Sequence, residues 1–262
     1  MVRHGLTGVA EVSCDLTQRE VTAQMLAAVE PSIVIHLVGK TDVDACETDP
    51  NDAFRLNVLT VENIVSGFRH RAGAYLVHIS TDHVYDAAGP SRESDVRLTN
   101  TYALSKYASE LAAAQMPSAI LRTSFFGNSL VPHRQSFSDW VLARLAAGLP
   151  CPVFDDVVVS PLSMVSLSRV ICAVVEQRIE GTLNVGSRDA LSKADIAYEL
   201  AHVFGLSDEP LLRSSVAAAG LHAYRPTDMS MDCSLANEKH GLVLPLLREE
   251  IFALKGESYA AG

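Results

Sequence analysis

The chain has 262 residues, with 21 Lys and Arg against 31 Asp and Glu, which gives a formal net charge of −10 with histidine neutral. Nucleic acid and anionic membranes are bound through positively charged surfaces, so this balance argues against both as the main partner. Hydrophobic residues make up 48% of the chain and charged residues 20%, which is typical of a globular protein of one large or two modest domains.

The five cysteines are scattered and show no C-x-x-C spacing, so the sequence predicts neither a disulfide framework nor a zinc site. The apolar stretches are too short to span a membrane, and the first residues lack the apolar core of a signal peptide. We therefore expect a protein of the reducing cytoplasm.

The first half of the chain alternates between helical and strand-like patterns. Apolar residues at helical spacing predict helices over 17–29, 52–69 and 101–115. Short apolar runs rich in branched side chains predict buried strands over 33–38, 75–80 and 119–123. This alternation predicts an α/β fold, a doubly wound parallel sheet with helices on both faces.

The second half is less regular. The expected elements are a helix over 137–147, a loop with a short strand over 150–161, a helix over 166–177, a strand over 181–186, a helix over 193–204 that Ser192 caps, and a helix over 246–254. We assign 1–124 to a dinucleotide-binding core, and 125–262 to a mixed segment that completes the core and forms a small substrate lobe.

The most informative pattern is Tyr102-x-x-x-Lys106. Residues four apart share one helix face, so both side chains can reach the same site. A neighbouring ammonium lowers the pKa of a phenol, which is ordinarily about 10, and so assists proton transfer. The pattern alone is common on solvated helices. However, a buried strand ends upstream at Ser80-Thr81-Asp82, and ligands of parallel α/β sheets bind outside the strand ends.

Taken together, these residues resemble a known family. The motifs that carry the resemblance to the extended short-chain dehydrogenase/reductases are Ser80-Thr81-Asp82, Tyr102-x-x-x-Lys106 and Leu121-Arg122-Thr123-Ser124-Phe125. The run V-G-K-T-D-V-D-A-C-E over 38–47, Asn57, and Arg225-Pro226-x-x-x-Ser230 are similar to the dTDP-4-dehydrorhamnose reductase branch. The resemblance extends from about residue 15 to about residue 245 and implies that NADPH or NADH reduces a nucleotide-linked 4-keto sugar.

The resemblance also implies a role for each matching position. Tyr102 would donate the proton, Lys106 would support it and hold the nicotinamide ribose, and Thr81 would bond the reacting oxygen. The implied cofactor-binding residues are Asp15, Leu16, Val38, Gly39, Lys40, Ser80, Tyr102 and Lys106. The implied substrate residues are Val43, Asp82, Phe125 and Arg225. This sequence departs from the family at Phe125, usually a tryptophan, and at His83, usually a tyrosine.

The main departure is an absence. No G-x-x-G-x-x-G or G-x-G-x-x-G occurs in the sequence, and Glu11 stands where a third glycine would follow Gly5 and Gly8. Two interpretations stay open: the chain is truncated at its start, or its natural form lacks the pyrophosphate cradle. In either case the sheet would lack its first strand, and we expect residues 1–12 or a partner chain to fill that place.

Two other functions stay open. One is a nucleotide-sugar epimerase or dehydratase, because those relatives share the tyrosine and lysine. The other is a non-catalytic binding subunit, like the regulatory β subunit of methionine adenosyltransferase, which resembles the same branch. The absence of a glycine-rich turn favours the binding subunit, whereas Thr81, Tyr102 and Lys106 favour an enzyme. If the protein assembles, the expected assembly is a homo-oligomer.

The remaining candidates are weaker. No resident metal is expected, although some relatives place a cation at a subunit contact near an acidic cluster such as Asp42, Asp44 and Glu47. We interpret the others as structural or solvated residues: His36 and His78 in apolar strands, Cys46 and Cys151 without activating neighbours, Asp155 and Asp156 in a loop, and His133 and Arg134 in a polar loop.

Overall fold

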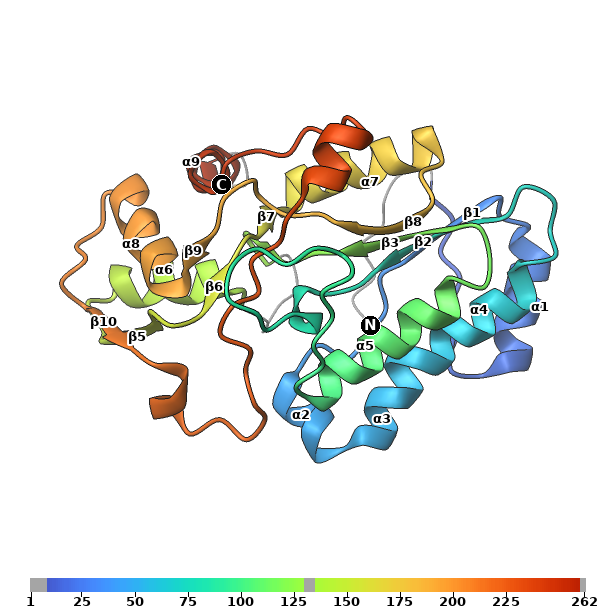
Figure 1. Ribbon diagram of the computed structural model, residues 1–262, viewed down its shortest axis with the longest axis horizontal. Helices are drawn as coiled ribbons and strands as arrows, with labels where there is room; N and C mark the ends of the chain where they lie inside the picture. Colours follow the sequence, from blue (N-terminus) through green and yellow to red (C-terminus); the bar gives the residue numbers. More distant parts are fainter. Residues whose placement is uncertain (1–8, 130–134, 260–262) are drawn as a thin grey trace.

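The computed structural model describes residues 9–129 and 135–259. Its centre is a parallel four-stranded sheet in the order β1-β2-β3-β8 (Figure 1). These strands are β1 (Ile33–His36), β2 (Tyr75–Ile79), β3 (Ser118–Arg122) and β8 (Gly181–Asn184). The predicted α/β fold with a parallel sheet is therefore confirmed.

Helices cover both faces of this sheet. On one face lie α1 (Arg19–Val29), α4 (Thr60–Phe68) and α5 (Thr101–Ala113), and on the other lies α7 (Met164–Gln177) (Figure 1). Alternate residues of β2 enter the two cores, because successive side chains of a strand point to opposite faces. Leu76 packs in the core with α1, α4 and α5, whereas Tyr75 and Val77 pack in the core with α7.

The long helical pattern over 52–69 is interrupted in the structure. It divides into α3 (Pro50–Phe54), a π-helical turn over Arg55–Leu59, and α4. A shorter helix that the sequence pattern did not predict, α2 (Val43–Thr48), precedes them, and the side chain of Asp42 caps it by accepting a hydrogen bond from the amide of Ala45.

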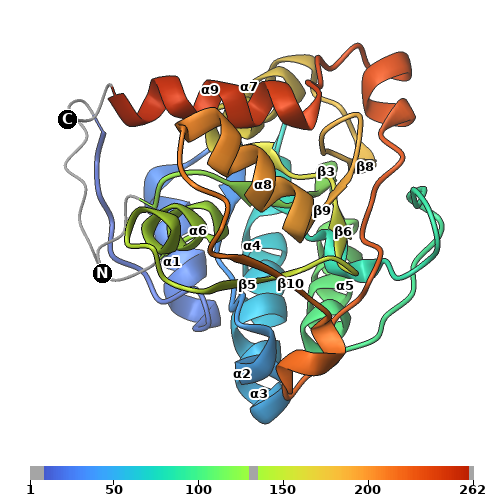
Figure 2. The same ribbon diagram turned by 90° about the vertical axis from the view of Figure 1, so that its left-hand side faces the viewer.

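The second half of the chain builds a lobe beside the sheet (Figures 1 and 2). Its helices are α6 (Phe137–Ala146), α8 (Lys193–Phe204) and α9 (Leu247–Tyr259), and β5 (Cys151–Phe154) pairs in parallel with β10 (Leu211–Ser214). Two small strand pairs join the lobe to the sheet: β4 (Phe125–Phe126) with β7 (Leu162–Ser163), and β6 (Val158–Val159) with β9 (Leu191–Ser192). Ser192 caps α8, as the sequence predicts.

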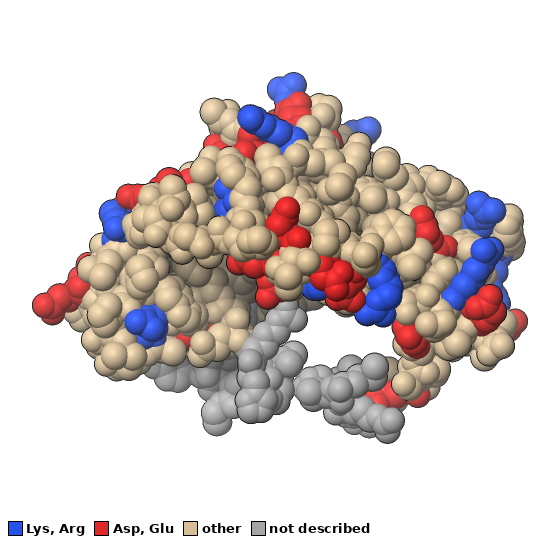
Figure 3. Space-filling view, turned by 90° about the horizontal axis from the view of Figure 1, so that it is seen from below, with Lys and Arg blue, Asp and Glu red and all other residues tan. Residues whose placement is uncertain are grey.

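The shorter turns are 3-10 helices over Asp82–Val84 and Val216–Ala219 and a π-helical turn over Leu235–Lys239. Within the described residues, no helix combines the length and the apolarity needed to cross a membrane. Figure 3 shows one face of the molecule, on which Lys and Arg are interspersed with Asp and Glu.

The expected substitute strand at the start of the chain is not formed by residues 9–13. This segment has no regular secondary structure, and Val9 and Val12 are each 59% exposed, so its apolar side chains are not packed. The place of the missing strand also differs from the expectation that the gap lies within the sheet. Among the described strands β1 is the outermost and pairs only with β2, so one edge of the sheet is open rather than a gap within it.

Candidate active site

The site is built where β2 ends and α5 begins. Thr81 follows β2 and caps the 3-10 turn by accepting a hydrogen bond from the amide of His83. Asn100 caps α5 through the amide of Ala103, which places Tyr102 in the first turn. The Thr81 side chain lies close enough to Tyr102 to lower the pKa of the phenol, and both residues are buried. The structure thus brings together two residues that are distant in sequence.

Lys106 completes this group one helical turn along α5. Its ammonium donates a hydrogen bond of 2.7 Å to the carbonyl oxygen of Ile79, the last residue of β2. Burial lowers the pKa of Lys106 to about 8, and the Glu110 carboxylate partly opposes that shift. The ammonium is therefore bound to the strand that carries Thr81.

The pKa of Tyr102 shifts in the direction opposite to the expectation from the sequence. Burial raises it to about 12, the hydrogen bond from Thr81 lowers it in part, and the Asp82 carboxylate raises it. The expected lowering of the Tyr102 pKa is therefore not found in this arrangement, because desolvation of the phenol outweighs the interaction with Thr81 that lowers it. At neutral pH the tyrosine is protonated and suited to donating a proton.

Asn57 connects the end of β1 to α5. Its amide accepts a hydrogen bond from the Lys40 amide at 2.6 Å, and donates to the Lys40 carbonyl at 3.2 Å and to the Ser105 hydroxyl at 2.8 Å. Ser105 in turn donates to the carbonyl of Tyr102. A Cβ at Gly39 would lie 3.1 Å from the Asn57 amide oxygen, so the close approach favours glycine. The π-helical turn carries Asn57, and such turns are frequent at functional sites.

A buried ion pair supports the end of β2 from behind. The Arg122 guanidinium lies 2.7 Å from a carboxylate oxygen of Glu110, and both side chains are almost fully buried. Glu110 also accepts a hydrogen bond from the hydroxyl of Ser80. Ser80, expected as a cofactor residue, thus directs its hydroxyl toward this ion pair.

Asp82 and His83 lie on the side of the site that faces the second lobe. Burial raises the pKa of Asp82 to about 6, and the Lys193 ammonium opposes that shift. Burial lowers the pKa of His83 to about 3, so this imidazole is neutral, and its ring lies edge-on to that of Tyr102 with centroids 5.3 Å apart. The expected substrate residue Asp82 is therefore adjacent to Thr81 and close to a cation from α8.

The other expected substrate residues take different positions. Val43 is buried in a small cluster with Tyr102, whereas Phe125 is 53% exposed on β4. The Arg225 guanidinium pairs with the Asp44 carboxylate at 2.9 Å and holds the segment around it against α2. Arg225 is close enough to lower the pKa values of His83 and Lys193, so it lies beside the site although it is paired.

The expected cofactor residues lie along the end of β1. Leu16 and Val38 line one apolar groove of about 260 Å³ between α1 and β1. Asp15 is exposed and accepts hydrogen bonds from Thr17, and Lys40 pairs with Asp52 at 2.8 Å. The donor set of Thr81, Tyr102 and Lys106 suits the ribose and carbonyl end of a nicotinamide cofactor. The sequence contains no glycine-rich turn for its pyrophosphate.

The acidic cluster near α2 has structural partners. Asp42 caps α2, Asp44 pairs with Arg225, and Glu47 accepts a hydrogen bond from the amide of Thr101. In the described parts of the chain, no group of three or more His, Cys, Asp or Glu residues is arranged to hold a metal ion.

The weaker candidates are mostly structural. His36 and His78 are buried, their Nδ1 atoms lie 3.2 Å apart, and burial lowers both pKa values. Cys46 and Cys151 are buried free thiols whose pKa values are raised by burial. Asp156 accepts hydrogen bonds from the amide of Val216. His133 and Arg134 lie outside the described residues.

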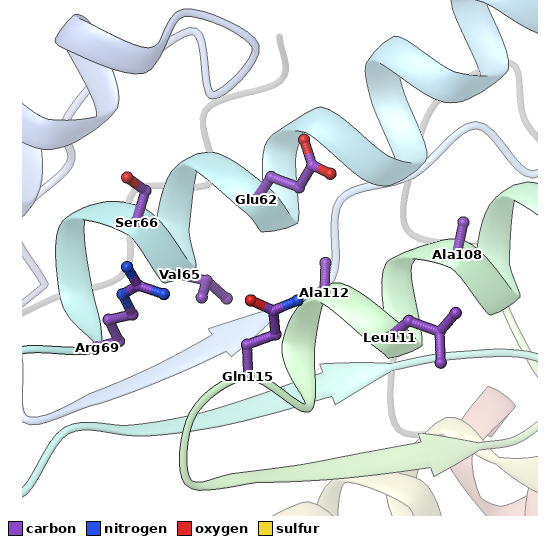
Figure 4. Close-up of a pocket in the computed structure, with 8 residues that line it drawn as sticks. All are labelled: Glu62, Val65, Ser66, Arg69, Ala108, Leu111, Ala112 and Gln115. Atoms are coloured by element: carbon purple, nitrogen blue, oxygen red, sulfur yellow. The ribbon is translucent and has the colours of Figure 1, made fainter.

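A separate groove of about 340 Å³ runs between α4 and α5 on the outside of the molecule (Figure 4). Its labelled side chains include Glu62 on α4, Arg69 directly after that helix, and Leu111 on α5. It contains none of the expected catalytic, cofactor or substrate residues, so we do not assign it to the site.

Sequence reasoning missed Glu110 and Lys193. Glu110 lies on a helix whose charged residues are ordinarily solvated, and its partner Arg122 comes from another strand. Lys193 had a usable signal, because it directly follows the helix cap Ser192 and a cation at a helix N-terminus opposes the helix dipole.

The chain is similar to known proteins over most of its length. Residues 2–257 match the family described as RmlD substrate binding domain. A relative from Haloferax volcanii, the probable low-salt glycan biosynthesis reductase Agl14, is 29% identical over 249 residues, which cover 92% of this chain and 82% of that protein. The β subunit of methionine adenosyltransferase 2 from Danio rerio is 21% identical over 233 residues, covering 85% of this chain and 71% of that protein.

A solved structure supports the same fold. The crystal structure of dTDP-4-dehydrorhamnose reductase from Bacillus anthracis in complex with NADP has a TM-score of 0.86 at 23% identity, and the match covers 93% of this chain and 87% of that one. The comparisons confirm the resemblance to the dTDP-4-dehydrorhamnose reductase branch that the sequence motifs indicate.

Proposed function

The chain belongs to the RmlD substrate binding domain family, and from this we propose that it is an oxidoreductase that reduces a nucleotide-linked 4-keto sugar with NADPH or NADH. The observation that carries the proposal is the proximity of the buried Thr81 and Tyr102 side chains at the carboxyl end of β2, with Lys106 anchored to the same strand. A protonated phenol beside a second hydroxyl is the arrangement that a carbonyl oxygen needs when it becomes an alcohol.

The residues of this chain would act on the keto oxygen. Tyr102 donates its proton to that oxygen as negative charge develops there, and Thr81 donates a hydrogen bond that stabilises the same charge. Lys106 keeps the end of β2 and the catalytic helix in register, and its positive charge favours the phenolate that proton donation leaves. When bound, the cofactor supplies the hydride to the carbon of the keto group.

The activity is tested with the purified chain and a dTDP-4-dehydro-6-deoxyhexose as substrate. We expect NADPH or NADH oxidation, followed by its absorbance, to depend on the keto sugar, and cofactor binding to be measurable by titration. If neither cofactor binds at millimolar concentration, the reductase proposal is wrong for this chain.

A second candidate is a non-catalytic binding subunit, which the similarity to the β subunit of methionine adenosyltransferase 2 favours. The same titration separates the two. A chain that binds nucleotide or a protein partner, but neither binds nor oxidises NADPH and NADH, would support the binding subunit.

A further inference from the structure

We propose that Glu110 is a positioning residue of the reduction, which acts through Lys106 by supplying the negative charge that keeps the buried ammonium charged. This inference rests on the proposed function, because Lys106 is the residue that supports proton donation by Tyr102. Glu110 lies one turn beyond Lys106 on α5, and its side chain is almost fully buried.

The helical turn that carries Glu110 contacts the same strand end as Lys106. The Lys106 ammonium donates a hydrogen bond of 2.7 Å to the carbonyl oxygen of Ile79. The Glu110 carboxylate accepts a hydrogen bond from the hydroxyl of Ser80, the next residue along the chain. Residues four apart share one face of a helix. The lysine and the glutamate therefore lie on the same side of α5 and against the same segment.

The Glu110 carboxylate is held in place by donors. The Arg122 Nε lies 3.0 Å and 3.2 Å from its two oxygens, and an Arg122 Nη lies 2.7 Å from one of them. The Ser80 hydroxyl donates to it as well. The partners that the described residues offer to Glu110 are thus all donors, which suits an ionised carboxylate because that group only accepts. A fixed negative charge therefore lies one turn from Lys106.

The Lys106 ammonium needs such a charge because it is desolvated. Burial lowers the pKa of Lys106 to about 8, and the Glu110 carboxylate opposes that shift. The other titratable groups that interact with Lys106 are the imidazoles of His36 on β1 and His78 on β2. Burial and the Lys106 charge lower the pKa values of both, so these rings are neutral and cannot balance the ammonium.

The charge of Lys106 matters at the moment of proton donation. Burial raises the pKa of Tyr102 to about 12, so the phenol is protonated at neutral and mildly alkaline pH. Donation of its proton leaves a phenolate, which Lys106 stabilises only while it is an ammonium. Without Glu110, the lysine would lose its proton closer to neutral pH. Glu110 thereby extends the pH range in which the tyrosine can act.

The first test is the pH dependence of kcat in the wild type and in Glu110→Gln. We expect activity to fall on the alkaline side near the Lys106 pKa of about 8. In Glu110→Gln this fall should begin roughly one pH unit lower, because one nearby charge is removed. The loss relative to wild type should therefore approach about tenfold near pH 9 and stay below about twofold near pH 6.

Two further variants separate the charge of Glu110 from its structural role. Arg122→Lys keeps a cation beside Glu110 but loses the forked guanidinium, so the alkaline fall should stay at the wild-type pH. The double variant Glu110→Gln with Arg122→Met leaves no guanidinium unpaired and should show the same displacement as Glu110→Gln. Thermal unfolding checks that each variant is folded. An equal loss of activity at every pH, or the same displacement in Arg122→Lys, would overturn the inference.

The second test needs no turnover. The titration of Lys106 is followed by NMR in protein labelled with carbon-13 in its lysine side chains, and Lys106→Met identifies the signal. The Lys106 pKa should fall by roughly one unit in Glu110→Gln and in the double variant, but not in Arg122→Lys.

This measurement separates the inference from the proposed function. If NADPH is oxidised with a keto sugar but the Lys106 titration is the same in Glu110→Gln as in the wild type, the inference fails and the proposed function stands. If the titration moves as expected but neither NADPH nor NADH binds, Glu110 sets the charge of Lys106 and the reductase proposal fails.

Discussion

The Lys106 ammonium is hydrogen bonded to the Ile79 carbonyl, 2.7 Å away, at the point where β2 ends two residues before Thr81. This bond ties the catalytic helix to the strand end that presents the threonine. Tyr102, one turn earlier on the same helix, is therefore held at a fixed distance from Thr81. The lysine thus acts on the geometry of the site as well as on its charge.

Replacing Tyr102 with phenylalanine tests the proton donor. We expect Tyr102→Phe to lower kcat by roughly a hundredfold to ten-thousandfold, because general acid catalysis contributes about that factor. Substrate and cofactor binding should change little. Tyr107→Phe is the control on the same helix, because Tyr107 packs near Arg122, away from the site. A Tyr102→Phe variant that keeps more than about a tenth of the wild-type rate would assign the proton donor to another group.

Thr81 should respond to the loss of its hydroxyl and not to a change in size. Thr81→Val keeps the shape of the side chain but removes the hydroxyl beside Tyr102, so we expect kcat to fall by roughly ten- to a hundredfold. Thr81→Ser keeps the hydroxyl and should retain most activity. Steady-state kinetics on both variants decide this, and equal losses in the two would mean that the methyl group, not the hydroxyl, is required.

The buried ion pair of Glu110 and Arg122 should be important for stability. Glu110→Gln leaves the guanidinium without a countercharge in the interior, which we expect to cost about 3 kcal/mol of unfolding free energy. The control is Glu199→Gln, whose partner Arg248 is 70% exposed, and its effect should stay below about 1 kcal/mol. Chemical denaturation measures both. Similar effects in the two variants would contradict the difference in burial.

Asp82 should make stability depend on pH. Its pKa is raised from 3.8 to about 6 by burial, so the folded protein holds this proton more tightly than the unfolded chain. The stability that it contributes is complete below pH 4 and is lost as the pH rises through about 6. The unfolding free energy of Asp82→Asn should therefore rise relative to wild type by up to roughly 3 kcal/mol between pH 4 and pH 7.

Denaturation of both proteins across this range gives the difference directly. A constant gap between variant and wild type would show that Asp82 is ionised with an ordinary pKa in the folded protein. If the unfolding free energy of the wild type instead rises relative to that of Asp82→Asn as the pH rises, the carboxylate is stabilised by its surroundings. Lys193 would then be the first group to test.

The parts of the fold with a strong repeating pattern could be predicted from the sequence. The expected helix over 193–204 matches α8, and the strand over 33–38 overlaps β1, because their apolar residues recur at the spacing of each element. The six-residue helix α2 could not be predicted this way, since it is too short to show a period. The π-helical turn within 52–69 could not be predicted either, because its apolar residues continue the α-helical pattern of the residues on both sides.

The candidate site could also be predicted only in part from the sequence. Tyr102 and Lys106 share a helix face, and Thr81 follows a recognisable strand. This spacing is weak alone, and the resemblance to a known family was needed to select the three residues. The pKa of Tyr102 was not predictable, because it depends on how completely the folded chain buries the phenol. Lys193 could be recognised only as a cation that follows a helix cap, because Asp82 and Phe137 approach it from distant segments of the chain.

The ion pair between Asp44 and Arg225 joins residues that are 181 positions apart. A chain grows from its N-terminus during synthesis, and this contact cannot form until most of the polypeptide has left the ribosome. The sheet also cannot be completed early, because β3 pairs with β8, which is synthesised much later. Thr81 and Tyr102 are therefore synthesised long before Arg225 and the segment around it. The site becomes complete only near the end of synthesis.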